Sequence, residues 1–95
     1  MRRQLNRDDA EDIAISGLGF LASDPERLDR FLSVTGLGPE NLRSAAQEPK
    51  FLASVLDYIA SDESLLVALA GHSGIAPERV GQAHLLLAGP AAGHD

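Results

Sequence analysis

The chain has 95 residues, of which 44% are hydrophobic, 4% aromatic and none cysteine, and its formal net charge at pH 7 is −6. This composition indicates one small domain rich in helix-forming residues, and the lack of cysteine excludes disulfides and thiolate-bound zinc. The acidic balance argues against the basic face of a nucleic-acid-binding protein. The apolar runs are too short for a secretory signal or a membrane span, so we expect a cytoplasmic protein without membrane contact.

The two ends of the chain lack the hydrophobic pattern of its middle. Residues 1–7 are polar and basic, and residues 90–95 begin at the proline of a Gly-Pro pair and continue with small and polar side chains. Ends of this kind are commonly poorly ordered. We therefore predict a flexible N-terminal arm (1–7), a single all-helical domain (8–89) and a flexible tail (90–95).

The first predicted helix runs from about Asp8 to Ala22, and its acidic start suits the positive end of a helix dipole. One face of it carries Ile13, Gly17, Phe20 and Leu21. Gly17 and Gly19 each cost a helix roughly 1 kcal/mol relative to alanine. We expect these glycines either to let a neighbouring helix approach closely or to form a hinge or small-molecule contact.

The second predicted helix, about Pro25 to Thr35, is amphipathic. Its inward face carries Leu28, Phe31, Leu32 and Thr35, and its outward face carries Glu26, Arg27, Asp29 and Arg30. A short third helix is predicted from Pro39 to Gln47, with Leu42 and Ala46 as its apolar anchors.

The stretch Phe20–Leu42 recurs without a gap, 38 residues further on, as Tyr58–Val80. The repeated residues are largely helix boundaries: Ser-Asp pairs typical of helix starts, glycines typical of left-handed helix ends, and Pro-Glu pairs that begin the next helix. A fixed period of this length is typical of a duplicated structural unit. We predict an all-α, compact six-helix bundle built from two tandem three-helix units, about 11–48 and 49–88, related by a pseudo-twofold.

The second unit differs from the first in its central helix. Its fourth helix, about Pro49 to Ala60, has an ordinary apolar face, but the fifth contains the run LLVALA, which is apolar on every side. We expect the fourth and fifth helices near the middle of the bundle, or the fifth covered by another molecule. The sixth, about Pro77 to Ala88, ends in three successive leucines, and we expect one of them to remain exposed in a monomer.

These helices carry more apolar surface than one small domain readily buries. The candidate partner-binding residues are Leu65, Val67, Leu86 and Leu87. Exposed apolar patches mark protein interfaces, so the leading hypothesis is a non-catalytic protein-interaction module that binds another protein or forms a homodimer. The alternative is a well-filled core without a partner.

A second functional hypothesis is a transcription-associated protein of the helix-turn-helix type. The corner around Gly74 and Ile75 has a small residue before it and apolar anchors after it, at a spacing that resembles this motif. Its second helix begins Pro77-Glu78-Arg79, and a glutamate there makes a poor phosphate contact. We therefore keep DNA binding as the alternative.

The sequence offers no convincing catalytic, cofactor or metal site. His72 and His84 lack a histidine or carboxylate partner at the spacing that places two metal ligands on one helix face, and His94 lies in the tail. No serine stands in a nucleophile-elbow motif. We expect no enzyme activity, no cofactor and no metal.

The segments D-P-E-R-L, T-G-L and L-D-Y-I-A-S-D-E resemble a family of short all-helical alphaproteobacterial proteins known only as a domain of unknown function, DUF3572. The resemblance covers roughly Ile13 to Pro90. It implies a small bacterial cytoplasmic protein, and it implies no activity, cofactor or catalytic residue.

Overall fold

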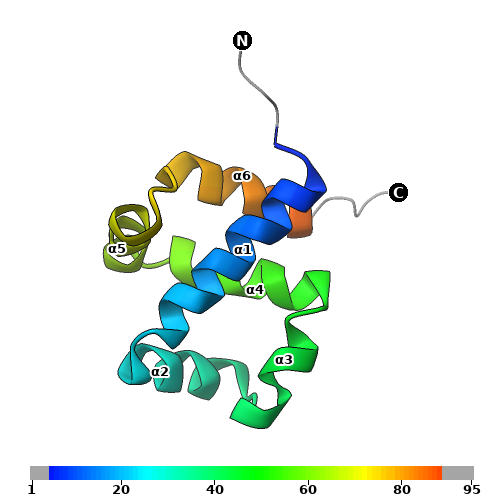
Figure 1. Cartoon of the computed structure of the whole chain (residues 1–95), viewed down its shortest axis with the longest axis vertical. Helices are drawn as coiled ribbons and strands as arrows, with labels where there is room; N and C mark the ends of the chain where they lie inside the picture. Colours follow the sequence, from blue (N-terminus) through cyan, green and yellow to red (C-terminus); the bar gives the residue numbers. More distant parts are fainter. Residues whose placement is uncertain (1–4, 89–95) are drawn as a thin grey trace.

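The computed structural model describes residues 5–88, and all regular structure in that range is helical (Figure 1). The elements are α1 (Arg7–Ala22), α2 (Pro25–Thr35), the 3-10 helix η1 (Pro39–Asn41), α3 (Leu42–Ala45), α4 (Pro49–Ala60), α5 (Glu63–Ser73) and α6 (Pro77–Ala88). The predicted all-α six-helix fold is confirmed. None of the helices within 5–88 is both long and apolar enough to cross a bilayer.

The centre of the bundle is formed by α1, α4 and α6. Helix α1 runs diagonally across α4, and α6 packs against both, while α2 and α5 flank this trio (Figure 1). The expectation that α5 is central is therefore wrong. Of its residues only Leu69 is buried, because α5 lies at the edge of the bundle and turns one side alone toward α1 and α4.

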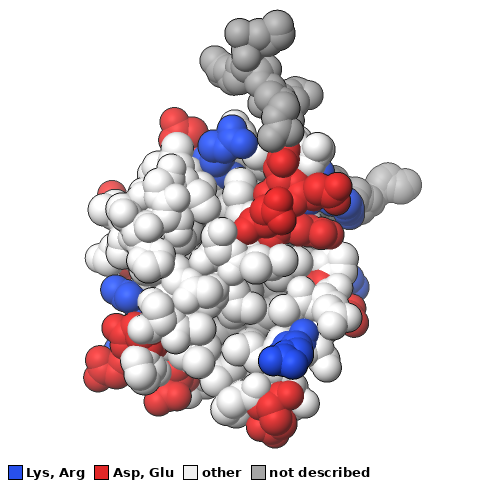
Figure 2. All heavy atoms as spheres, in the orientation of Figure 1, with Lys and Arg blue, Asp and Glu red and all other residues white. Residues whose placement is uncertain are grey.

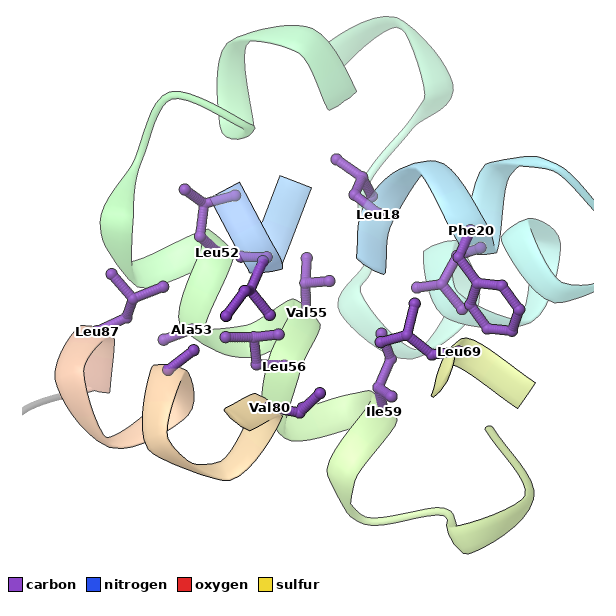
Figure 3. Close-up of a cluster of buried hydrophobic side chains, with 14 of the residues drawn as sticks. Leu18, Phe20, Leu52, Ala53, Val55, Leu56, Ile59, Leu69, Val80 and Leu87 are labelled. Carbon is purple, nitrogen blue, oxygen red and sulfur yellow. The ribbon is translucent and has the colours of Figure 1, made fainter. Parts of the chain in front are cut away.

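The hydrophobic core is continuous across the two sequence repeats (Figure 3). Among its fully buried large side chains are Leu21 of α1, Leu56 and Ile59 of α4, and Val80 of α6. Gly17 explains how closely α1 and α4 cross, since a Cβ on it would lie 2.9 Å from the Ile59 side chain. For Gly17, the prediction of a close helix approach is confirmed.

Helix α1 begins one residue earlier than predicted, because Asn6 caps it. The Asn6 side chain accepts a hydrogen bond from the Asp9 backbone N–H (2.8 Å), and the Asp9 carboxylate accepts one from the Asn6 N–H (3.2 Å). Such a reciprocal capping box fixes a helix start. Leu5 packs on the core, so residues 5–7 of the expected flexible arm belong to the fold. Residues 1–4 and the predicted tail, 90–95, lie outside the described residues.

The repeated boundary residues form nearly identical local structures. Asp24 and Asp62 cap α2 and α5 with side-chain hydrogen bonds to the N–H two residues on, both at 3.0 Å. Gly36 and Gly74 end these helices in the left-handed region, with φ of 76° and 74°. A left-handed glycine of this kind is a common helix end. The predicted caps are confirmed at both places.

The third elements of the two units differ. The second unit ends in the 12-residue α6, which packs on α4 and α1. The first ends in η1 and the four-residue α3, neither of which has a buried residue. The expected continuous helix from Pro39 to Gln47 is thus a 3-10 turn followed by a single α-helical turn, and the pseudo-twofold stays a prediction.

Candidate partner-binding surface

Helix α5 carries the first half of the predicted partner surface. Leu69 points into the core beside Phe20 (Figure 3) and is fully buried, while Leu65 is half-buried and packs against the core. Val67 points away and is 60% exposed. Within this helix, Val67 thus leaves apolar surface uncovered by the rest of the chain.

The exposed side of α5 is lined by small and apolar residues. Ser64, Val67, Ala68 and Gly71 follow the spacing i, i+3, i+4 and i+7, which places them on one face; we call this set the outer face of α5. Three of them are exposed, and Ala68 is half-buried and also packs against the core. A shallow hollow of about 450 Å³ lies on it, lined by Glu63, Ser64, Val67 and Ala68. A Cβ added to Gly71 would meet no atom within 4 Å, so packing inside the chain does not require glycine there.

The same positions of α2 carry a different surface. Thirty-eight residues before the outer face of α5 stand Glu26, Asp29, Arg30 and Ser33, and all four are exposed. In the space-filling view, several red patches and a little blue lie over α2, whereas the surface over α5 is largely uncharged (Figure 2). Charges on an exposed face are the ordinary solution for a surface helix. Their replacement in α5 makes its outer face the unusual one.

The second half of the predicted surface requires correction. Leu87 is only 6% exposed and packs in the core under α6, so the expectation that it lies outside is wrong. Leu86 is 36% exposed and Leu85, which we did not select, is 68% exposed. These leucines occupy the C-terminal end of α6, at the opposite side of the bundle from α5 (Figure 1). The four predicted residues therefore do not form one patch.

A hollow between helices, on the described part of the chain, was not predicted from the sequence. It has a volume of about 710 Å³ and lies between α2, α4 and the end of α3. Three aromatic rings stand at its wall, with the Phe31 centroid 5.9 Å from that of Phe51 and 5.1 Å from that of Tyr58, both edge to face. The rings come from two helices, so only the tertiary structure reveals the cluster.

The histidines take part in contacts that the sequence did not predict. His84 Nε2 of α6 lies 3.7 Å from Asp57 Oδ1 of α4, an ion pair only when the imidazole is protonated. The His72 ring lies tilted by 53° against Phe20, with 5.4 Å between centroids, and the Arg27 guanidinium lies 4.6 Å from the centroid of the Phe20 ring. No group of three or more potential metal ligands occurs within 5–88. His94 lies outside that range.

The helix-turn-helix-like corner between α5 and α6 buries much of its second helix. Val80, Ala83 and Leu87 of α6 face the core. Its exposed side carries Glu78, Gln82, Leu85 and Leu86, of which none is basic. Phosphate contacts come chiefly from lysine and arginine, and Arg79, half-buried, is the sole basic residue of this type on α6.

Comparison with known proteins defines the family and nothing further. No match was found among curated proteins or among solved structures. A family model for proteins of unknown function, DUF3572, matches residues 7–90, which is nearly the whole chain. The chain therefore belongs to the DUF3572 family.

Proposed function

We propose that this protein is a non-catalytic protein-interaction module that binds its partner through the outer face of α5. The observation that carries the proposal is the contrast between two helices with matching caps and matching length. At the positions where α2 exposes Glu26, Asp29 and Arg30, α5 carries Ser64, Val67 and Ala68 and no charge. An uncharged, apolar helix face exposed to solvent marks a place where another molecule binds.

The chemistry of the outer face indicates what kind of partner it fits. Small side chains let a second helix approach closely, and Val67 offers one apolar projection for the partner to enclose. Glu63 is the single charged residue lining the hollow on this face. The partner surface we propose is therefore an apolar helix face with small residues, laid against α5 as in helix-in-groove recognition.

Site-specific photo-crosslinking in the native cell tests this proposal. A photoreactive residue at position 67 of α5 is compared with the same residue at position 29 of α2, the position 38 residues earlier. We expect a discrete higher-mass adduct from position 67 and none from position 29. Equal labelling from both positions, or no adduct from either, would contradict the proposal.

A pair of substitutions then separates the face from general surface effects. Val67→Glu should abolish the adduct formed by a photoreactive residue at the neighbouring position 64. Val34→Glu is the matched control, because Val34 of α2 is 67% exposed against 60% for Val67. The control variant should retain the adduct. Loss of the adduct in both variants would show that the effect of Val67→Glu is not specific to the outer face of α5.

The proposal places the module in the bacterial cytoplasm. A chain without cysteine offers nothing for an oxidising compartment to cross-link, and the resemblance to short bacterial proteins supports the same location. Cell fractionation with an antibody against the protein tests this, and recovery in the envelope fraction would contradict it.

DNA binding receives less support from the structure. The exposed side of α6 combines a glutamate, a glutamine and two leucines, and the chain carries a net charge of −6. A filter-binding assay at low salt would reveal even weak phosphate-driven association. We expect no retention of duplex DNA.

A further inference from the structure

A second uncharacterised surface lies between α1 and the η1–α3 segment. It is a groove of about 450 Å³ whose floor is a stripe of α1: Ile15, Leu18, Gly19 and Ala22. Its other wall is formed by Pro39, Leu42, Arg43 and Ala46. Ile15 projects from the stripe and is 51% exposed. The groove is apolar except for Arg43.

Gly19 has no explanation inside the chain. A Cβ at this position would meet nothing within 4 Å, whereas a Cβ on Gly17, two residues earlier, would clash with the Ile59 side chain. A mid-helix glycine destabilises a helix relative to alanine, and its backbone here is ordinary helix, so no turn requires it. What glycine provides at this position is a hollow on the exterior of α1, next to the Ile15 projection.

The second half of the chain shows how the equivalent groove is closed. Thirty-eight residues further on, α6 lies on α4, and Leu56, Val80 and Ala83 are all fully buried there. Their counterparts in the first half are Leu18, Leu42 and Ala45. Leu42 packs partly against the core, but both Leu42 and Ala45 stay only half-buried, because α3 is a single turn without a fully buried residue. The first half thus leaves open a groove that the second half fills with a helix.

We propose that this groove binds a second copy of the chain in a twofold, antiparallel contact between the two α1 helices. In a twofold contact, every pairing occurs twice: if one residue of the first copy contacts a second residue of the other copy, the same two positions also meet with the copies exchanged. Ile15 and Gly19 are four residues apart and share one face. An antiparallel pair places each Ile15 in the hollow over the partner copy's Gly19, whereas a parallel pair would place Ile15 against Ile15.

Charge complementarity supports the same occupant. Glu11 lies one turn before Ile15 on the same stripe, and Arg43 lines the groove on the wall facing α1. Within residues 5–88 neither Glu11 nor Arg43 has an ion-pair partner. The antiparallel arrangement brings Glu11 of each copy toward Arg43 of the other. Figure 2 shows the surface concerned: acidic over the first turns of α1, uncharged along its middle and basic over α3.

Sedimentation equilibrium of the purified full chain, from micromolar to millimolar concentration at physiological ionic strength, tests this contact. At that ionic strength the Debye length of about 8 Å screens the repulsion between two copies of net charge −6. We expect a reversible monomer–dimer equilibrium for the natural sequence and a monomer for Gly19→Leu. A monomer at every concentration of the natural sequence would overturn the proposal.

A matched variant locates the interface. Gly71→Leu makes the same change at an exposed helical glycine of α5 whose Cβ would also meet no atom, and it should leave the dimer intact. A dimer lost in Gly71→Leu but kept in Gly19→Leu would place self-association on α5 and contradict this inference. Both variants should remain folded: each replaces a helical glycine by a good helix former, which should raise the melting temperature of the dilute protein by about 4–8 °C.

Charge reversal tests the orientation of the two copies. Arg43→Glu should weaken the dimer roughly tenfold, within the range for two exposed ion pairs lost together. The double variant Glu11→Arg, Arg43→Glu should recover most of that loss, because it restores opposite charges across the twofold. Failure of the double variant to recover affinity would exclude the antiparallel pairing.

Discussion

Helices α2 and α5 are two versions of one helix with different exteriors. Both have 11 residues, an aspartate N-cap and a left-handed glycine at the end. Both place one fully buried anchor at the same position, Phe31 in α2 and Leu69 in α5. Their outward faces differ, charged in α2 and uncharged in α5. The comparison separates the caps and buried anchors, which form and attach the helix, from the outward residues, which determine whether it faces water or a partner.

The buried anchors should give the largest effects. Phe31 is fully buried and contacts two aromatic rings, so Phe31→Ala should lower the free energy of unfolding by about 3–5 kcal/mol. Leu69→Ala should cost about 2–5 kcal/mol. Urea denaturation followed by circular dichroism measures both. If Leu69→Ala left the free energy of unfolding nearly unchanged, Leu69 would not attach α5 to the core as Phe31 attaches α2.

Removal of the aspartate caps should give the next largest loss of stability. Asp24→Ala and Asp62→Ala each remove a side-chain acceptor from a helix start, at a cost of about 1 kcal/mol. Asp62 also accepts from the Leu65 N–H at 3.3 Å, and Asp24 lies 3.7 Å from the Arg27 guanidinium. Because each has one such additional contact, we expect similar losses in urea denaturation. A strongly unequal pair would show that the two caps are not equivalent.

Replacement of the left-handed glycines should lower the stability slightly less. An alanine in this conformation is destabilised by roughly 1–2 kcal/mol, partly offset by about 0.4–1 kcal/mol from its less flexible unfolded chain. Gly36→Ala and Gly74→Ala should therefore each lower the melting temperature by a few degrees, to the same extent, in differential scanning calorimetry. An unchanged melting temperature in either variant would contradict its left-handed φ.

Exchanging outward residues should have the smallest effect on stability. Val67→Asp and Asp29→Val swap the two helices at equivalent exposed positions, and surface changes usually stay within about 0.5 kcal/mol. Urea denaturation of each variant against the natural sequence measures this. A loss well beyond that amount for Val67→Asp would mean that Val67 packs within the chain and is not free to bind a partner.

Local structure was largely predictable from the sequence, and packing was not. The caps at Asp24, Gly36, Asp62 and Gly74 depend on residues within one turn, so their roles can be deduced from short segments. The segment after Gly38 repeats the Pro-Glu start of α6, yet it forms only two short turns. A segment of this length becomes a full helix chiefly by packing its apolar face, and whether it packs depends on the rest of the bundle.

The same limit applies to the candidate surface. Val67 could be selected because its helix is apolar on every side and one side must face outward. Leu85, Leu86 and Leu87 are adjacent leucines, and only the orientation of α6 on α4 and α1 decides that Leu87 is buried and Leu85 exposed. Position 87 was chosen wrongly for that reason. The α1 groove escaped notice because its two walls are distant in sequence.

The most direct test of the central claim is to give α5 the exterior of α2. The variant Ser64→Glu, Val67→Asp, Ala68→Arg, Gly71→Ser copies the outward residues of α2 into the equivalent positions. In affinity capture from native cell extract, we predict that this variant keeps its helical circular dichroism and loses the partner retained by the natural sequence. Undiminished capture by the folded variant would contradict the assignment of α5 as the partner-binding helix.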